Sequence, residues 1–383
     1  MRTAGILLPV TSLPSGYGIG CFSDAAYKFI DFLREAKQSF WQVLPLGQTG
    51  YGDSPYQSFS SFAGNPYMIS LETLICEGLL TDSECDGTGL DANKEYIDYE
   101  MQYEKRYPLL RKAYERSNIS NNGDFKSFCK KNAYWLEDYA LYTALKKRFD
   151  QKAFYDWESE YKQREAFALD RAKNELHGEI EFCKFIQYKF FEQWNKLKRY
   201  ANGNGVEIIG DIPIYTAADS ADVWANPKLF QLDRERKPKF VAGCPPDGFS
   251  EEGQLWGNPV YDWTQNRAER FDWWIKRIAH SFMMYDVLRI DHFRGFDEYY
   301  SIKYGSKNAV VGEWRKGPGI DLFRAVERSL GKKRVIAEDL GYITDSVRKL
   351  VRDSGFCGMK VLEFAFDSRD TGSANDYLPH NYI

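Results

Sequence analysis

The chain has 383 residues, enough to bury a large core and too many for one simple small domain. Its formal net charge of −4 argues against nucleic acid or an anionic membrane surface as the main partner. Aromatic residues make up 16% of the chain, which suits stacking on flat-faced ligands such as sugars, although most of these rings have to fill the core.

Six short apolar runs are predicted to form strands: residues 5–10, 40–46, 206–215, 286–293, 334–341 and 359–366. Amphipathic helices are predicted between several of them. Residues 22–36 place Ala26, Phe29, Ile30 and Leu33 on one stripe. Residues 344–356 have Thr344 as a helix N-cap and Gly355 as a stop. This repetition of strand, helix and strand indicates a parallel sheet with helical crossovers.

Two intervals are too long to be single crossovers. Residues 72–200 follow a helical pattern, and the last helix predicted there ends at Gly203. The stripe of that helix comprises Phe182, Ile186, Phe190, Trp194 and Leu197. Residues 216–275 carry turn-rich, aromatic loop sequence. We interpret residues 1–383 as one interrupted catalytic barrel, with a mainly helical insertion at 72–200 and a loop-rich insertion at 216–275, both on the catalytic face.

Two of the predicted strands end in carboxylates. VLRIDHFRGF at 287–296 contains Asp291, and VIAEDLG at 335–341 contains Glu338 and Asp339. A charged side chain at the carboxyl end of a buried strand is destabilising unless it lies at the open mouth of a barrel. The active sites of barrel enzymes lie at that mouth. Two carboxylates from neighbouring strands are what retaining glycoside chemistry requires.

Cysteine and histidine usage excludes other kinds of site. The seven cysteines are scattered and show no CxxC spacing, as expected of reduced thiols in the cytoplasm. The four histidines form no HxH or HExxH pair, so neither a metal site nor a cofactor is expected. The apolar run at 5–10 is too short for a signal peptide, and no window approaches a membrane span. We expect a cytoplasmic monomer.

Seven collinear segments carry a family resemblance. They are LPSGYGIG (13–20), FWQVLPLG (40–47), YGDSPYQSFSSFAGNPY (51–67), GDIPIY (210–215), PPDGFSEEGQLWGNPVYDW (245–263), RIDHFRGF (289–296) and AEDLG (337–341). Together they resemble the amylomaltases, which are 4-alpha-glucanotransferases also called disproportionating enzymes. The matches run along nearly the whole chain, although residues 85–180 contribute little.

The resemblance implies a (β/α)₈ TIM barrel and two catalytic carboxylates. Asp291 would be the nucleophile that forms a covalent glucosyl-enzyme, and Glu338 the acid/base. The residues themselves agree, because Arg289 and Asp291 are two apart on a strand and point to the same face. Arg289 would hold Asp291 ionised, whereas Glu338 needs a drier setting that raises its pKa. A purely structural ion pair between Arg289 and Asp291 is the alternative.

Four further residues are candidates for binding substrate. Asp211 resembles the family's supporting carboxylate and would bond Arg289 or a sugar hydroxyl, with loop capping as the alternative. Tyr56 resembles the ring that stacks under the sugar, and Tyr51 would contact glucan further out. Trp256 lies in a loop that the family uses as a lid over the glucan, or else it anchors that loop to the barrel.

Two neighbours of the catalytic carboxylates are expected to have supporting roles. His292 follows the proposed nucleophile and would face away from the mouth of the barrel, so we expect it in the core or behind the site. Asp339, next to Glu338, faces the other way and is expected to be a structural hydrogen-bonding residue.

The chain departs from the family in its C-terminal part. Enzymes of this type use a third carboxylate, an Asp in a His-Asp-Asn-Asp segment on the seventh strand, and no such segment exists here. Six predicted strands are also two short of a complete barrel. We therefore expect a fragment, a truncated product or part of a longer enzyme, and expect residues 1–383 alone to be inactive.

Three functions follow. The first is retaining transfer of an α-1,4-glucan segment from a donor to the 4-hydroxyl of an acceptor glucose or maltodextrin, with starch or glycogen fragments as further substrates. The second is an α-amylase-type hydrolase that uses the same chemistry with water as acceptor. The third is a non-catalytic glucan-binding remnant. The lid and the YGDSPYQ segment favour the transferase.

Overall fold

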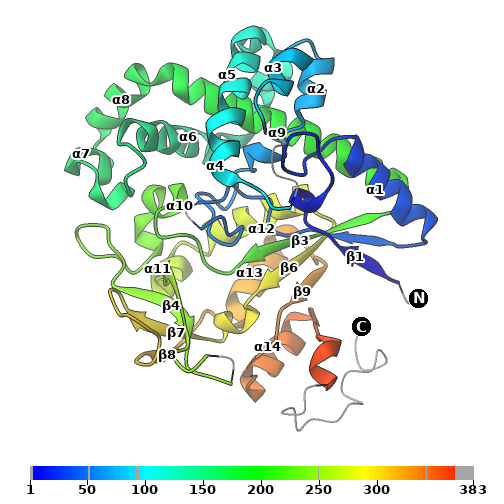
Figure 1. Cartoon of the computed structure of the whole chain (residues 1–383). Helices are drawn as coiled ribbons and strands as arrows, with labels where there is room; N and C mark the ends of the chain where they lie inside the picture. Colours follow the sequence, from blue (N-terminus) through cyan, green and yellow to red (C-terminus); the bar gives the residue numbers. More distant parts are fainter. Residues whose placement is uncertain (1–2, 51, 91–94, 249, 342, 367–383) are drawn as a thin grey trace. The chain divides into compact units, whose positions relative to one another are not determined.

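The computed structural model describes residues 3–50, 52–90, 95–248, 250–341 and 343–366 (Figure 1). The chain divides into two compact units. Unit 1 comprises Met1–Ile209, Thr216–Pro227 and Arg234–Lys237. Unit 2 comprises Gly210–Tyr215, Lys228–Asp233 and Pro238–Ile383. The prediction of one barrel with two insertions on its catalytic face stays a prediction.

Unit 1 contains three short parallel strands. Strand β1 (Gly5–Leu7) pairs with β2 (Phe40–Gln42), and β2 pairs with the first residues of β3 (Glu207–Pro213), where Trp41 lies opposite Ile208. Trp41 and Ile208 are fully buried, as expected for strands covered on both faces. These strands occur where the sequence predicts them, although they are shorter.

The remainder of unit 1 is mainly helical. Its helices are α1 (Asp24–Glu35), α2 (Leu71–Cys76), α3 (Asp82–Asp86), α4 (Tyr99–Met101), α5 (Tyr107–Arg116), α6 (Gly123–Arg148), α7 (Ser159–Lys162), α8 (Ala166–Glu175), α9 (His177–Gly203) and α10 (Ala221–Ala225). The predicted stripe of α9 is buried over its whole length, and ring contacts such as Phe128 with Phe191 join α6 to α9. The predicted stripe of α1 is likewise buried at Ala26, Ile30 and Leu33.

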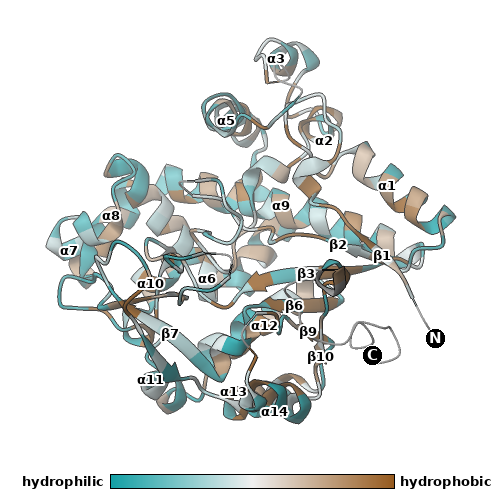
Figure 2. Cartoon of the chain, turned by 60° about the horizontal axis from the view of Figure 1, so that its bottom comes forward, coloured by the Kyte–Doolittle hydropathy of each residue, from teal (hydrophilic) through white to brown (hydrophobic). Residues whose placement is uncertain are grey.

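Unit 2 holds the strands that end in carboxylates. The second part of β3 is followed by β6 (Val287–Asp291), β9 (Val335–Ala337) and β10 (Cys357–Gly358), and the hydrogen-bonded order of the whole sheet is β1-β2-β3-β6-β9-β10. Helices α11 (Trp263–Ala268), α12 (Asp272–Met284), α13 (Ile320–Leu330) and α14 (Asp345–Ser354) belong to the same unit. Parallel strands that alternate with helices in this way are the repeating element of a (β/α) barrel. In Figure 2, β3 is mainly hydrophobic whereas α14 is largely hydrophilic.

Helix α14 illustrates how local sequence sets these boundaries. The Thr344 side chain accepts a hydrogen bond from the backbone N–H of Val347, which satisfies one of the free donors at the helix start. Gly355 ends the helix with a left-handed φ of 69°. Both features are as predicted from the sequence.

A second sheet in unit 2 was not predicted. Its antiparallel order is β5-β4-β7-β8, formed by β4 (Phe240–Cys244), β5 (Gln254–Pro259), β7 (Glu298–Lys303) and β8 (Glu313–Lys316) (Figure 1). The register of β4 with β5 shifts between Val241 and Gly243, so the pairing of these two strands is irregular there. Strands this short leave little alternating pattern to detect, and glycine interrupts β4 and β5. The segment predicted to be loop-rich therefore contains β4 and β5.

The prediction of a sixth strand at residues 359–366 is wrong. Residues 359–366 do not extend; Cys357–Gly358 pairs with β9, and Leu362–Phe366 forms the 3₁₀ helix η8. A short apolar run is compatible with either a strand or a buried helical segment, because periodicity alone does not distinguish them. The strand at this position thus begins earlier and is only two residues long.

Arg277 of α12 holds the carboxyl end of β3. Its guanidinium donates to the carbonyl oxygens of Pro213 (2.5 Å) and Ile214 (3.0 Å), and it is 2% exposed. The Tyr261 hydroxyl donates to the same Ile214 carbonyl at 2.9 Å. These bonds satisfy backbone acceptors at the end of β3, where the strand gives way to a loop.

Replacing Arg277 with leucine should lower the free energy of unfolding by about 2–3 kcal/mol, because buried carbonyl groups lose charged donors. Urea unfolding measures this change. The control Lys276→Ala removes an exposed ion pair with Asp272 on the same helix and should change stability by less than about 0.5 kcal/mol. Equal effects of the two substitutions would show that Arg277 does not hold the end of β3.

Candidate active site

The two catalytic candidates lie at the carboxyl ends of neighbouring strands. Ile290 of β6 pairs with Ala337 of β9, and Asp291 and Glu338 are the next residue of each chain segment. The Glu338 N–H donates to the Ile290 carbonyl at 3.0 Å, so the hydrogen bonding between β6 and β9 continues to the carboxyl ends of both strands. Because paired strands lie about 4.8 Å apart, this register brings both carboxylates to the same edge of the sheet.

A chain of three charged side chains crosses this edge. Arg289 donates from one nitrogen to both carboxylate oxygens of Asp211, at 2.8 and 2.7 Å, and from the other to Asp291 at 2.9 Å. Asp211 is 1% exposed, so its charge depends on this pairing. Arg289 and Asp291 lie on the same face of β6, as the two-residue spacing predicts.

Glu338 is held by the backbone. Its two oxygens accept hydrogen bonds from the N–H groups of His292 and Leu340, both at 2.8 Å. Burial raises the pKa of Glu338, and the nearby negative charge of Asp291 adds to the rise. The two N–H donors and the positive charge of Arg289 act in the opposite direction without cancelling it. Glu338 thus holds its proton to a higher pH than an exposed glutamate.

Asp339 points to a different neighbour. Its Oδ1 accepts a hydrogen bond from the backbone N–H of Met359 at 2.9 Å, beside β10. This bond links the chain after β9 to the chain after β10. Asp339 therefore has the structural contact that the sequence predicts.

Trp256 and His292 contact each other. The two rings meet edge to face, with centroids 4.7 Å apart and planes at 84°. Trp256 lies on β5 rather than in a loop and is half-buried, and its Nε1 donates to the Gln254 side chain at 3.1 Å. The sequence predicts no such pairing, because His292 has a left-handed backbone with φ 52° to which strand alternation does not apply.

The two tyrosine candidates belong to unit 1. Tyr56 lies in a turn, is half-buried, and donates its backbone N–H to the Ser54 hydroxyl at 3.3 Å. Tyr51 lies outside the described residues. The glucan contacts of both tyrosines stay predictions.

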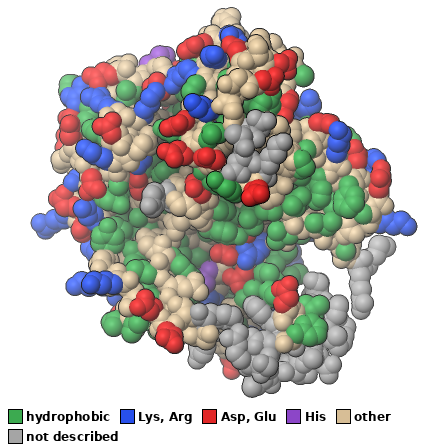
Figure 3. Space-filling view, viewed as in Figure 1, with side chains coloured by type: hydrophobic (Ala, Val, Ile, Leu, Met, Phe, Trp, Pro, Cys, Tyr) green, Lys and Arg blue, Asp and Glu red, His purple; other side chains and the backbone are tan. Residues whose placement is uncertain are grey.

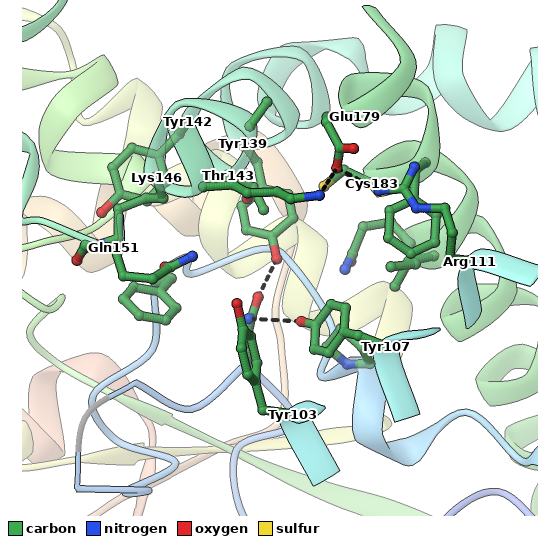
Figure 4. Close-up of a pocket in the computed structure, with 18 of the residues that line it drawn as sticks. Tyr103, Tyr107, Arg111, Tyr139, Tyr142, Thr143, Lys146, Gln151, Glu179 and Cys183 are labelled. Carbon is green, nitrogen blue, oxygen red and sulfur yellow. Dashed lines mark hydrogen bonds and ion pairs between the residues drawn. The ribbon is translucent and has the colours of Figure 1, made fainter. Parts of the chain in front are cut away.

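A cavity in unit 1 lacks the features of a catalytic site. It has a volume of about 400 Å³ and lies among α5, α6 and α9, lined by both aromatic and polar side chains (Figure 4). Its polar groups bond one another: Tyr139 donates to Gln48 at 2.6 Å, and Gln48 donates to Tyr107 at 3.1 Å. None of the predicted catalytic residues lines it. The cluster in unit 2 is therefore the better candidate for chemistry.

The described residues also contain no group of three or more His, Cys, Asp or Glu side chains placed to hold a metal ion. None of the helices within the described ranges is long and apolar enough to cross a membrane.

The cluster can perform general acid and nucleophilic chemistry on one substrate. Asp291 is paired with a guanidinium and is 32% exposed at its side chain, so it is oriented and accessible to a substrate. Burial raises the pKa of Glu338, in the direction that a general acid requires. The hydrogen bonds from the backbone N–H groups of His292 and Leu340 to Glu338 were not predicted, because the pattern of side-chain types does not determine backbone geometry.

Known proteins resemble this chain over nearly all of its length. A family model described as 4-alpha-glucanotransferase matches residues 8–383. The 4-alpha-glucanotransferase of Clostridium butyricum is 48% identical over 374 residues, which are 97% of this chain and 76% of that protein. The 4-alpha-glucanotransferase of Streptococcus pneumoniae strain TIGR4 is also 48% identical, over 100% of this chain and 76% of that protein.

Solved structures give the same result for the fold. The amylomaltase from Streptococcus agalactiae, in complex with acarbose, has a TM-score of 0.95 and 42% identity, covering 100% of this chain and 77% of that one. The amylomaltase from Corynebacterium glutamicum has a TM-score of 0.79 at 19% identity, covering 97% and 52%. The predicted barrel-type α/β fold is confirmed by this similarity.

The raised pKa of Glu338 predicts how stability depends on pH. The folded protein holds this proton more tightly than the unfolded chain, so the stabilisation is full below the unfolded pKa of about 4.3 and is lost as pH rises through the folded pKa. Glu338→Gln does not titrate, so its melting temperature should rise relative to the parent protein between about pH 4 and pH 8.

Thermal unfolding of both proteins across this range measures the difference. The control Glu251→Gln, at an exposed position, corrects for the loss of one negative charge. A difference that does not change with pH would contradict the buried environment of Glu338.

Proposed function

The chain belongs to the 4-alpha-glucanotransferase family, and we propose that Asp291 and Glu338 carry out its reaction. That reaction transfers an α-1,4-glucan segment from a donor to the 4-hydroxyl of an acceptor glucose or maltodextrin. The observation that carries the residue assignment is the contrast between the two carboxylates. Asp291 is paired with Arg289, and Glu338 is half-buried with a raised pKa.

In the first half of the reaction, Asp291 attacks the anomeric carbon of the donor. A carbon–oxygen ester bond forms to Asp291 as the glycosidic bond to the leaving chain breaks. Glu338 gives its proton to the glycosidic oxygen of that chain. Arg289 donates a hydrogen bond to Asp291 and directs its carboxylate, and the buried Asp211 holds Arg289 in place.

In the second half, Glu338 changes from acid to base. It takes the proton from the 4-hydroxyl of the acceptor as that oxygen attacks the anomeric carbon, and the ester bond to Asp291 breaks. Two inversions at the same carbon retain the α configuration. The product is a glucan with the same linkage on a new acceptor.

Transfer instead of hydrolysis requires that water be kept from the intermediate. We assign this task to Trp256, whose indole packs on His292 next to the nucleophile. Tyr56 and Tyr51 would stack against glucan residues. The α-1,4-glucan of starch or glycogen fragments and maltodextrins is the substrate that these assignments fit.

Charge and cysteine chemistry support the proposed setting. Acidic and basic side chains are interspersed over the face shown in Figure 3, which suits a neutral glucan better than nucleic acid. All seven cysteines are free, which is the state expected in a reducing cytoplasm. We propose a cytoplasmic monomer.

Asp291→Asn should lower transfer by the full-length protein roughly a thousandfold or more, because the amide cannot form the ester. The control Asp297→Asn changes a carboxylate that lies just past the same strand and bonds Ser346. It should keep most of the activity. Initial rates of glucose release from maltotriose measure both, and an Asp291→Asn rate within about tenfold of the parent would overturn the assignment.

Maltotriose as the sole substrate should give glucose together with maltodextrins longer than maltotriose, because a second maltotriose accepts the transferred segment. Chromatography of the products at early times measures their lengths. A hydrolase that uses the same residues would give glucose and maltose without longer products. That outcome would show that the protein is a hydrolase and not a transferase.

A further inference from the structure

His292 is strained at the position that follows the nucleophile. It has φ 52° and ψ 47°, in the left-handed region that residues with a Cβ rarely adopt. The Gly295 N–H donates to the His292 carbonyl at 3.0 Å and closes the turn. A left-handed residue that is not glycine at such a place indicates a function for the conformation.

The strained turn at His292 forms two hydrogen bonds with Glu338, the proposed acid/base. The His292 N–H donates to Oε2 of Glu338 at 2.8 Å, and the next N–H, that of Phe293, donates to the Glu338 carbonyl at 3.0 Å. Two consecutive amides of one turn therefore fix the side chain and the backbone of the same residue. An extended His292 would turn the next peptide plane and direct the Phe293 N–H away from the Glu338 carbonyl, because φ and ψ of His292 set the orientation of that plane.

The imidazole of His292 is packed tightly from two sides. Trp256 contacts it edge to face at 4.7 Å. On another side Gly295 approaches the ring, and a Cβ there would lie 2.8 Å from Cδ1 of Ile214 and 3.1 Å from Cδ2 of the imidazole, so a larger residue would require these side chains to shift. The Nε2 atom is buried and has no hydrogen-bond partner among the described residues. Burial and the charge of Arg294 lower the pKa of His292 to about 3, so the ring is neutral near pH 7.

We propose that His292 is a positioning residue that aligns Glu338 through its backbone and supports Trp256 through its ring. The acid/base and the indole next to the nucleophile then depend on a single residue. This inference rests on the proposed roles of Glu338 and Trp256. Removing the His292 ring and relaxing the His292 backbone should have different consequences, which can be measured separately.

The backbone role is tested by comparing two donors. Cleavage of maltotriose needs a proton on the leaving oxygen, whereas α-glucosyl fluoride has a leaving group that needs little protonation. His292→Ala disfavours the left-handed backbone, so it should lower kcat on maltotriose about ten- to a hundredfold and on the fluoride by less than about threefold. His292→Asn tolerates that backbone and should keep the maltotriose-to-fluoride ratio of the parent protein.

The ring role is tested by the fate of the intermediate. His292→Asn lacks the ring and should release more glucose by hydrolysis per transfer event, by about threefold or more, because Trp256 loses its support. His292→Phe restores a ring and should return this ratio of hydrolysis to transfer toward the parent value, although phenylalanine disfavours the left-handed backbone and should lower the maltotriose-to-fluoride ratio as His292→Ala does. Product lengths from maltotriose give the ratio for each variant.

Three further variants make the outcome decisive. Lys37→Ala places the same strain at another left-handed position (φ 57°) in unit 1 and should leave both ratios unchanged. Gly295→Ala crowds the His292 ring without changing His292 itself. If the His292 variants do not fold, the same two ratios are measured on Gly295→Ala instead. Glu338→Gln should itself slow maltotriose selectively, and if it does not, the proposed acid role fails.

If Glu338→Gln behaves as expected while folded His292→Ala and His292→Asn keep both ratios within about twofold of the parent, the inference about His292 is overturned.

Discussion

The cluster in unit 2 depends on the pairing of Arg289 with the buried carboxylate of Asp211. A carboxylate that is 1% exposed is stable only if it is paired and hydrogen-bonded, and Arg289 supplies two bonds to it. The same guanidinium then has a fixed orientation, which directs its other terminal nitrogen to Asp291. The position of Asp291 therefore follows from the need to compensate a charge on the neighbouring strand.

Strand pairing extends this arrangement to Glu338. The register of β6 with β9 places Glu338 beside Asp291, but its surroundings are different. Arg289 bonds Asp291 directly, whereas Glu338 is held by two neutral backbone donors and is drier. Two carboxylates on adjacent strands thus have different surroundings, and only Glu338 has the raised pKa that suits a general acid. The left-handed turn at His292 lies between them and contacts both the acid and Trp256.

Features that depend on side-chain type and spacing could be predicted from the sequence. The strands that end at Asp291 and Glu338, the shared face of Arg289 and Asp291, and the capped helix α14 all follow from local patterns. Features set by backbone geometry or tertiary pairing could not. The antiparallel sheet that carries Trp256 is assembled from distant short strands, and residues 359–366 have an apolar pattern that two kinds of structure share. The bonds from His292 and Leu340 to Glu338 depend on φ and ψ, which residue type alone does not set at a histidine.

The central claim is that Asp291 bonds covalently to the glucan, and mass spectrometry tests it most directly. The full-length protein carrying Glu338→Gln would be mixed with α-maltotriosyl fluoride, whose leaving group departs without an acid, so that the intermediate accumulates. After rapid acid quenching and digestion, the peptide containing residues 287–296 should carry the added mass of one maltotriosyl group, with fragmentation placing it on Asp291. An adduct on Asp211 or any other residue, or fluoride release without an adduct at any time, would contradict the assignment.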